Sequence, residues 1–378
     1  MALISYLTTV RFGFGEIAGL GADLDEAGIR APLLVSDRGL AAAGLIDRLA
    51  EAAPNLRTAP VFLDVPTNPT EEAVLAALAL YRAGGCDGIV ALGGGSPIDL
   101  AKGVALLATH PGPLETYAAI LGGLPCITAA VAPVVAVPTT AGTGSEVGRA
   151  ALITLRDGRK LGFIAPHLIP RRAVCDPELT LGLPPALTAA TGMDAITHCL
   201  ETYLSPRDNP PAEAIALDGL ARASANLERA VADGADRAAR SEMMMAALMG
   251  GLTFQKGLGA VHALSHPLGG LKEVSLHHGT LNAVLLPAVL RFNAPAAEAK
   301  YAAIRRTLGL APGADLAAHV RALNARLNLP PSLAAMGVPR RVIPAIARAA
   351  TEDHSSATNP RPATAEDYAA LLEDAYTG

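Results

Sequence analysis

The chain has 378 residues, of which 51% are hydrophobic and 17% charged, a balance that excludes a largely disordered protein and suits two globular domains. Its 35 acidic residues outnumber 30 basic ones, and no dense basic run indicates a nucleic-acid partner. No apolar span is typical of a membrane helix, and the segment after Met1 lacks the features of a secretion signal, so we expect a cytoplasmic protein.

The first half of the chain alternates short apolar runs with helical patterns, as an α/β domain requires. The apolar runs are continuous, which is typical of buried parallel strands, and they predict strands at 32–36, 59–63, 88–92 and 134–137. A turn-rich segment follows the second run, and the spacing of apolar residues then predicts a helix over 71–83.

Beyond Pro184 the strand pattern ends, and Ala, Leu, Met and Glu recur at intervals of three and four residues. This spacing predicts an all-helical domain. The prolines that close the segment 176–185 mark the change between the two patterns. We therefore predict an α/β nucleotide-binding domain over residues 1–180 and an all-α domain over residues 181–378.

Two glycine-rich loops each follow a predicted strand. The first loop consists of Gly93, Gly94, Gly95 and Ser96 and precedes a predicted helix. Its backbone amides and the positive end of the helix dipole suit the binding of a phosphate. The alternative is a tight turn between strand and helix that binds nothing. The second loop, "PTTAGTGSE" at 138–146, offers several hydroxyl groups that suit a pyrophosphate and a ribose. Two such loops in one α/β half favour nucleotide binding.

Asp37 follows the apolar run "LLVS" and has two interpretations. Its carboxylate could accept hydrogen bonds from the ribose of an adenine nucleotide and repel a 2′-phosphate. The alternative is a helix cap, which is a frequent role of a lone aspartate after a strand.

The second half contains a spaced set of metal-ligand residue types. Asp194 and His198 stand four residues apart, as do His262 and His266, so each pair shares one helix face. The adjacent pair at 277–278 follows after a loop. A carboxylate with several histidines on apolar helices favours one divalent metal ion, although spacing alone leaves open which histidine of each later pair is the ligand.

Long motifs follow one another in a fixed order through nearly the whole chain. They are "LLVSD", "PTNPT", "GGGSPIDLAKG", "VPTTAGTGSEV", "ATGMDAITHCLE", "HALSHPLGG" and "HHGTLNAVLLP". In these motifs the sequence resembles the iron-containing, or group III, alcohol dehydrogenases. The resemblance implies a dehydroquinate synthase-like fold, with an α/β nucleotide-binding domain followed by an all-α metal-binding domain. It also implies a metal-dependent, NAD-linked alcohol dehydrogenase or aldehyde reductase.

The same resemblance implies which residues hold the metal ion. The implied ligands are Asp194, His198, His262 and His278. His278 stands directly before Gly279, and the family usually has proline at the position of His277. His266 then lies beside the nicotinamide as a catalytic residue that carries a proton. The implied metal is iron, with zinc as the alternative.

A cofactor site for NAD is also implied, in the first domain. Its implied members are Asp37, Asn68, Gly94, Gly95, Ser96, Asp99, Thr139, Thr140, Ser145 and Lys160. A carboxylate at position 37 accepts from a 2′-hydroxyl but repels a 2′-phosphate, so we expect NAD to be preferred over NADP.

Arg149 and Lys272 are candidates for binding a substrate carboxylate. Arg149 follows the motif "GTGSEV" and Lys272 follows the motif "HPLGG". The guanidinium of an arginine can pair with a carboxylate through two hydrogen bonds. The alternative for both residues is a surface cation or a structural ion pair.

The resemblance implies that the substrate is a small alcohol or aldehyde, and the expected reaction is the oxidation of 4-hydroxybutyrate to succinic semialdehyde. It also implies a homodimer. The alternatives are lactaldehyde or maleylacetate reduction, a general primary alcohol dehydrogenase, and a nucleotide-binding structural protein without turnover.

Overall fold

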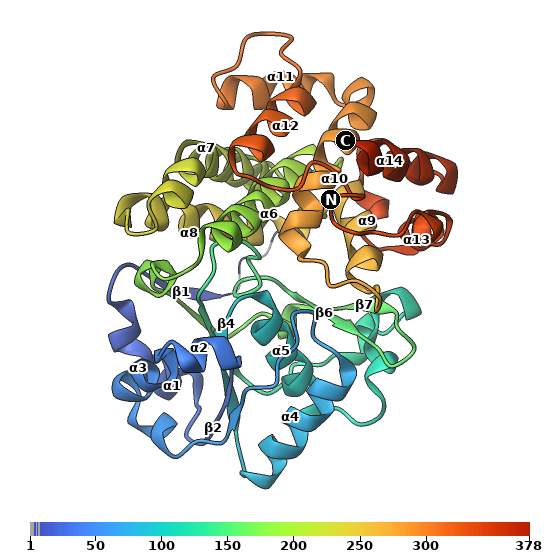
Figure 1. The fold of residues 1–378 in the computed structure, drawn as a ribbon. Coiled ribbons are helices and arrows are strands. Elements are labelled where there is room, and N and C mark those ends of the chain that lie inside the picture. Colours follow the sequence, from blue (N-terminus) through green and yellow to red (C-terminus); the bar gives the residue numbers. More distant parts are fainter. Residues whose placement is uncertain (1–3, 5, 7) are drawn as a thin grey trace. The chain divides into compact units, whose positions relative to one another are not determined.

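The computed structural model describes residues 4, 6 and 8–378, and these divide into two compact units. The sheet unit comprises Tyr6–Thr140 and Gly144–Gly182, and the helical unit comprises Leu183–Gly378 with the short segment Ala141–Thr143. All strands belong to the sheet unit, and the long helices after residue 183 belong to the helical unit (Figure 1). The predicted fold class is confirmed.

The sheet unit contains a six-stranded parallel sheet of order β1-β8-β5-β4-β2-β3. Its strands are β1 (Thr9–Phe12), β2 (Pro32–Val35), β3 (Val61–Phe62), β4 (Gly88–Gly93), β5 (Val134–Pro138) and β8 (Arg172–Cys175). The strands β6 (Ala150–Thr154) and β7 (Lys160–Ile164) form a separate antiparallel sheet. The four apolar runs of the sequence all form strands, and β3 is shorter than predicted.

Helices cover both faces of the sheet. Successive residues of a strand point to opposite faces, and the strand residues on both faces are apolar and buried. Leu33 and Val35 pack with α4 (Glu71–Ala83) and α5 (Gly95–Thr109), whereas Leu34 packs with α1 (Leu20–Ala27) and α3 (Leu45–Ala52). Helix α2 (Arg38–Ala42) follows β2. The predicted helix over 71–83 is α4, which begins after Thr70, whose hydroxyl accepts from the amide of Ala73.

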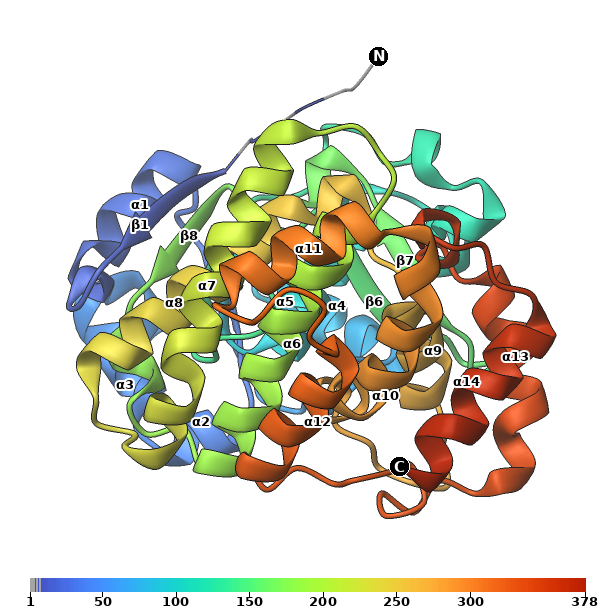
Figure 2. The same ribbon diagram turned by 90° about the horizontal axis from the view of Figure 1, so that it is seen from above.

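The helical unit is arranged around α6, in which every residue from Thr188 to Leu204 is buried. Helices α7, α8 and α10 pack against α6, and α9, α12 and α14 pack against α10 (Figures 1 and 2). The bounds are α6 (Pro185–Leu204), α7 (Pro210–Ala232), α8 (Arg237–Leu252), α9 (Ala260–Gly269), α10 (His278–Asn293), α11 (Glu298–Thr307), α12 (Leu316–Arg326), α13 (Ile343–Glu352) and α14 (Ala365–Thr377). No helix among the described residues is long and apolar enough to cross a membrane.

Candidate functional site

The two glycine-rich loops lie side by side at the carboxyl edge of the sheet. Gly93 at the end of β4 pairs with Pro138 of β5, and the amide of Thr139 donates to the Gly93 carbonyl at 3.0 Å. A methyl group on Gly94 would stand 3.2 Å from the hydroxyl of Thr140. In open α/β sheets this edge is where nucleotides bind.

Helix α5 begins directly at the first loop. Its N-cap is Gly94, which offers no side-chain hydrogen bond to the amides of the first turn. Gly93 adopts φ +148°, and a Cβ there would meet Cγ of Pro97 at 2.6 Å. The glycines thus permit a sharp entry into the helix, and they leave the backbone amides of Gly95 and Ser96 for an anion.

A buried network ties the second loop to α5. Asp99 accepts from the Ser145 hydroxyl at 2.5 Å and from the Leu152 amide at 3.0 Å. The fully buried ammonium of Lys102 donates to the Ser145 carbonyl, the Ser145 hydroxyl and the carbonyls of Gly148 and Ala150 at 2.8–2.9 Å. The network shapes the loop, and contact of Asp99 and Ser145 with a cofactor stays a prediction. Lys102, one helical turn after Asp99 on α5, was not predicted from the sequence.

Two buried ionisable groups belong to this network. Burial lowers the pKa of Lys102 to about 8, although Asp99 and Glu146 oppose the shift. Burial raises the pKa of Glu146 to about 7, against the opposing influence of its own backbone amide and of Lys102. The network therefore joins a lysine on α5 to a glutamate in the second loop, and both are costly to ionise.

Other predicted cofactor residues have protein partners. Asp37 caps α2 by accepting from the Leu40 amide at 2.9 Å, so the helix-cap interpretation is correct for this oxygen. Ser96 donates to the carbonyl of Thr67. Lys160 donates to Oδ1 of Asn68 at 2.8 Å, which brings these two predicted residues together. The cofactor role of each stays a prediction.

In the helical unit, three helices bring the predicted metal ligands together. Asp194 and His198 lie on α6, His262 lies on α9 and His278 begins α10. A Cβ on Gly279 would stand 2.2 Å from the Ala190 carbonyl, so only glycine allows α10 to approach α6 this closely. The close approach positions His278 beside Asp194.

The distances among these side chains fit a divalent cation. Oδ1 of Asp194 lies 3.4 Å from Nε2 of His198 and 3.8 Å from Nε2 of both His262 and His278. Ligand atoms about 2.1 Å from a tetrahedral ion are roughly 3.4 Å apart. Asp194, His262 and His278 form a ligand group whose atoms all lie within 4.8 Å of one another, and Nε2 of His198 lies nearer still to Oδ1 of Asp194. One carboxylate and several imidazoles suit zinc, iron and related metals.

Hydrogen bonds at Nδ1 determine the tautomers of His262 and His198. Nδ1 of His262 donates to Glu201 at 2.6 Å, and Nδ1 of His198 donates to the Gly142 carbonyl at 3.2 Å. Both rings therefore direct Nε2 as an acceptor towards Asp194, the arrangement expected of metal ligands. Glu201 was missed in the sequence, where its signal is its position three residues after His198.

The electrostatic surroundings of these two imidazoles differ. Burial lowers the pKa of His198 to about 4, which keeps its ring neutral at physiological pH. Burial also acts to lower the pKa of His262, but the carboxylates of Glu201 and Asp194 outweigh it and raise the pKa. A cation among these ligands would oppose that protonation.

Asn282, one helical turn after His278, is a further residue that the sequence analysis missed. Its Nδ2 lies 2.7 Å from Oδ1 of Asp194 and 3.2 Å from Nε2 of both His262 and His278. Its buried Oδ1 has no hydrogen-bond partner among the described residues. The amide thus faces the same point as the ligand atoms, which marks that point as a polar centre.

His266 lies one turn after His262 on α9 and is buried. Its ring stacks with that of His278 at a centroid distance of 5.7 Å, and its Nδ1 donates to Asp353 at 2.8 Å. His266 is therefore adjacent to the tight ligand group without belonging to it. Its catalytic role stays a prediction.

The sequence analysis also named His277, Lys272 and Arg149, and none of them belongs to the group of Asp194, His262 and His278. His277 is the N-cap of α10, and its buried Nδ1 has no hydrogen-bond partner among the described residues. Lys272 is exposed in the loop before α10, and Arg149 is half-buried just before β6. The substrate roles of both cations stay predictions.

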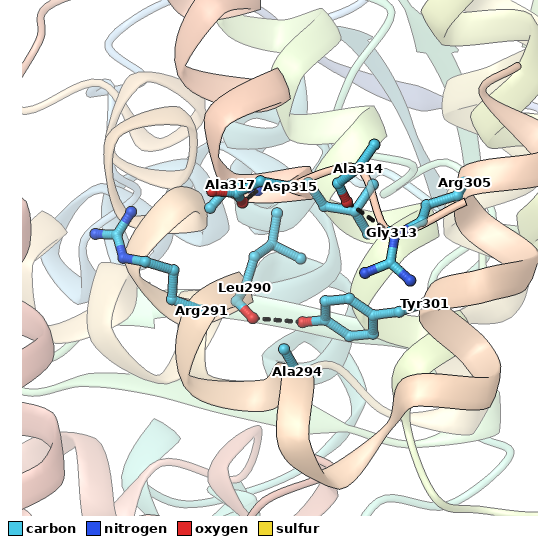
Figure 3. A pocket seen from close by; sticks show the side chains of 10 residues that line it. Leu290, Arg291, Ala294, Tyr301, Arg305, Gly313, Ala314, Asp315 and Ala317 are labelled. Atoms are coloured by element: carbon cyan, nitrogen blue, oxygen red, sulfur yellow. Dashed lines mark hydrogen bonds between the residues drawn. The ribbon is translucent and has the colours of Figure 1, made fainter. Parts of the chain in front are cut away.

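A pocket of about 260 Å³ opens at the far end of α10 (Figure 3). It is lined by Leu290, Tyr301 and Arg305 among others, and the Tyr301 hydroxyl donates to the Leu290 carbonyl at 2.7 Å. Leu290 is twelve residues beyond His278, or about 18 Å along the helix. This pocket is separate from the histidine cluster.

Comparison with known proteins identifies the family. The iron-containing alcohol dehydrogenase model matches residues 8–177, and the C-terminal model of the Fe-containing alcohol dehydrogenase family matches residues 188–376. The chain belongs to the iron-containing alcohol dehydrogenase family. It is 56% identical over 380 residues to the 4-hydroxybutyrate dehydrogenase of Cupriavidus necator, with 99% of each chain covered. The predicted family membership is thereby confirmed.

Solved structures agree with this assignment to the iron-containing alcohol dehydrogenases. The structure of 1,3-propanediol oxidoreductase matches with a TM-score of 0.92 and 36% identity, covering 99% of this chain and 100% of that one. A sulfoacetaldehyde reductase from Bifidobacterium kashiwanohense, solved in complex with NAD+, matches with a TM-score of 0.89 and 26% identity, covering 99% and 98%. The protein is an oxidoreductase, as predicted.

Proposed function

We propose that this alcohol dehydrogenase interconverts 4-hydroxybutyrate and succinic semialdehyde, with NAD as the cofactor and one divalent metal ion. The 56% identity to a 4-hydroxybutyrate dehydrogenase over the full chain carries the substrate proposal. The N-terminus of α5, without a side-chain cap, and the adjoining second loop support NAD binding. The homodimeric state and the cytoplasmic location stay predictions.

The residues proposed to hold the metal ion are Asp194, His198, His262 and His278, and iron is the proposed metal, with zinc as the alternative. Such an ion supplies Lewis-acid polarisation of the alcohol or aldehyde oxygen. The protein contributes the orientation of its ligands, through Glu201 and the Gly142 carbonyl, and it excludes bulk water from buried imidazoles. His266, beside this group, is proposed to move a proton at Nε2, because Asp353 occupies its Nδ1.

The experiment that tests the substrate proposal compares 4-hydroxybutyrate with 1-butanol. Metal content is measured first, and reduction of NAD+ is then followed by absorbance with the iron-loaded protein. We expect kcat/KM to be at least tenfold higher for the hydroxy acid. Similar values for the two alcohols, in a protein that turns over both, would remove the carboxylate preference and leave a general alcohol dehydrogenase.

Arg149 is the proposed carboxylate partner, and Lys272 is a second candidate. Arg149→Ala should reduce the preference for the hydroxy acid by roughly 10- to 100-fold, the scale of a charge-assisted hydrogen bond. Arg156→Ala removes an exposed arginine from the turn between β6 and β7 and serves as the matched control. Unchanged selectivity in Arg149→Ala would exclude this residue and direct the same test to Lys272→Ala.

A further inference from the structure

Asp353 lies directly after the end of α13, where α13 packs against α9. Its side chain is 10% exposed. Oδ2 accepts from Nδ1 of His266 at 2.8 Å, and Oδ1 accepts from the backbone amide of Ser355 at 2.8 Å. The amide fixes one end of the carboxylate, so the other end has a defined direction towards the imidazole.

The carboxylate is held in its charged form by its neighbours. Burial alone would raise the pKa of Asp353, but His266, His354 and the Ser355 amide together outweigh burial and lower the pKa strongly. An ionised carboxylate can only accept hydrogen bonds. Nδ1 of His266 must therefore be the donor of this pair.

A stack of rings fixes the plane of His266. Its ring lies nearly parallel to that of His278, with an interplanar angle of 6°, and to that of His354, with an angle of 16° and a centroid distance of 5.6 Å. Stacking restrains the tilt of the ring, and the bond to Asp353 restrains its rotation. Asp353 accepts a hydrogen bond from Nδ1 of His266, just as Glu201 accepts one from Nδ1 of His262. His266, however, is outside the ligand group.

We infer that Asp353 is a positioning residue of the reaction, which holds His266 as the Nδ1–H tautomer and leaves Nε2 as the nitrogen that accepts a proton from substrate or water. The inference rests on the proposed function, because it gives His266 a task in alcohol oxidation. A partner carboxylate that selects one imidazole tautomer is an established way to orient a catalytic histidine.

The same atoms allow one competing interpretation. His266, Asp353 and His354 could each direct one ligand atom to a second cation, since these atoms lie within 4.8 Å of one another. In that case Asp353 would be a metal ligand rather than the acceptor of an N–H. The number of metal ions bound per chain separates the two interpretations.

The test uses Asp353→Asn, which keeps the shape of the side chain but replaces an acceptor oxygen with an NH2 donor. Glu352→Gln, which removes an exposed charge at the adjacent position, is the matched control. We expect Asp353→Asn to lower kcat for alcohol oxidation by roughly 10- to 100-fold with KM changed less than about threefold. Glu352→Gln should keep the activity of the unaltered enzyme.

A double-mutant cycle shows whether Asp353 acts through His266. In the His266→Gln background, Asp353→Asn should cause no further loss of kcat, because the group to be positioned is already absent. A further loss of the same size as in the unaltered enzyme would overturn the inference. Two metal ions per chain in the unaltered protein and one in Asp353→Asn would overturn it in favour of the second cation site.

The tautomer of His266 can also be measured independently of activity. In the zinc-loaded protein with ¹⁵N-labelled histidine, NMR correlations that disappear in His266→Gln identify this ring. We expect protonation at Nδ1 in the unaltered protein and at Nε2 in Asp353→Asn. A ring protonated at both nitrogens, or unchanged by the substitution, would overturn the inference. If only the proposed function were wrong, His266 would still have the expected tautomer, but the protein would not oxidise alcohols.

Discussion

Two adjacent histidines at the start of α10 have different surroundings. His278 directs Nε2 to within 3.8 Å of Oδ1 of Asp194, and Asn282 bridges the same two atoms. His277 is instead the N-cap residue, and its side chain makes no capping hydrogen bond. The helix start thus separates two residues that are alike in the sequence.

We predict that His278→Ala abolishes turnover and lowers metal content, because it removes an imidazole from the ligand group. His277→Ala should retain the metal, since its ring does not belong to that group. Metal content after dialysis against metal-free buffer, together with NAD+ reduction, measures both effects. Equal metal loss in the two variants, or loss in His277→Ala alone, would contradict the ligand assignment.

Glu146 gives a prediction for stability as a function of pH. Its pKa is raised from 4.5 to about 7 in the folded protein, so the folded state binds more protons than the unfolded state between these values. The contribution of neutral Glu146 is complete below pH 4.5 and is lost as the pH rises through 7. The shift corresponds to roughly 3 kcal/mol.

Glu146→Gln keeps a neutral side chain at every pH. Its free energy of unfolding relative to the unaltered protein should therefore increase between pH 4.5 and 7 by up to about 3 kcal/mol. Denaturant unfolding at several pH values measures the difference. Glu51→Gln, at an exposed position, should show almost no such trend. A pH-independent difference for Glu146→Gln would show that this carboxyl is not the titrating group.

At the scale of elements, the contact between α6 and α10 depends on one glycine. Gly279→Ala would place a methyl group 2.2 Å from the Ala190 carbonyl, a backbone atom that cannot move independently. We predict a loss of about 1–3 kcal/mol in stability and a weaker metal site, because the helices must separate. Thermal unfolding and metal content are the measurements. Gly182→Ala, where no atom lies within 4 Å of the added carbon, is the control.

The junction of β2 and α2 carries the cofactor prediction. Asp37 caps α2 with one oxygen, and it follows β2 at the edge of the sheet that also holds both glycine-rich loops. Asp37→Gly should narrow the preference for NAD over NADP, because the charge that repels a 2′-phosphate is removed. Glycine is itself a tolerated N-cap, so the substitution should cost only a few tenths of a kcal/mol, roughly. Comparable kcat/KM with both cofactors in the unaltered enzyme would contradict the prediction.

At the scale of the whole molecule, one ion would connect helices that are far apart in the chain. The proposed ligands come from α6, α9 and α10, so metal binding should stabilise the helical unit as a whole. Free metal at a hundred times its Kd stabilises a protein by about 2.7 kcal/mol. We predict that chelation lowers the unfolding temperature by several degrees and that added metal restores it.

Differential scanning calorimetry measures this effect. His278→Ala is the control, because a protein that has lost the site should respond much less to the chelator. An equal response in both proteins would show that the chelator acts elsewhere. No response in the unaltered, metal-loaded protein would contradict the proposed link between the ion and the helical unit.

The sequence by itself determined the strands β2, β4 and β5, the helix α4 and the all-helical character of the second half. These features follow from local periodicity, because a continuous apolar run suits a strand buried on both faces and a three-to-four spacing suits one face of a helix. The family membership was also predictable, since its motifs are long and ordered. The residues Asp194, His198, His262 and His278 were named from spacing together with these motifs.

Only the tertiary structure decided which groups surround those residues. Glu201 and Asn282 lie one turn from named histidines, so helical spacing contained a weak signal for both. Asp353 is 87 residues from His266 and Lys102 is 43 residues from Ser145, distances over which local pattern carries no information. The short strands β1 and β8 were missed for the same reason, because each is defined by pairing with a strand far along the chain. Side-chain partners of this kind exist only after packing, which brings buried donors and acceptors together because a buried polar group without a hydrogen bond costs free energy.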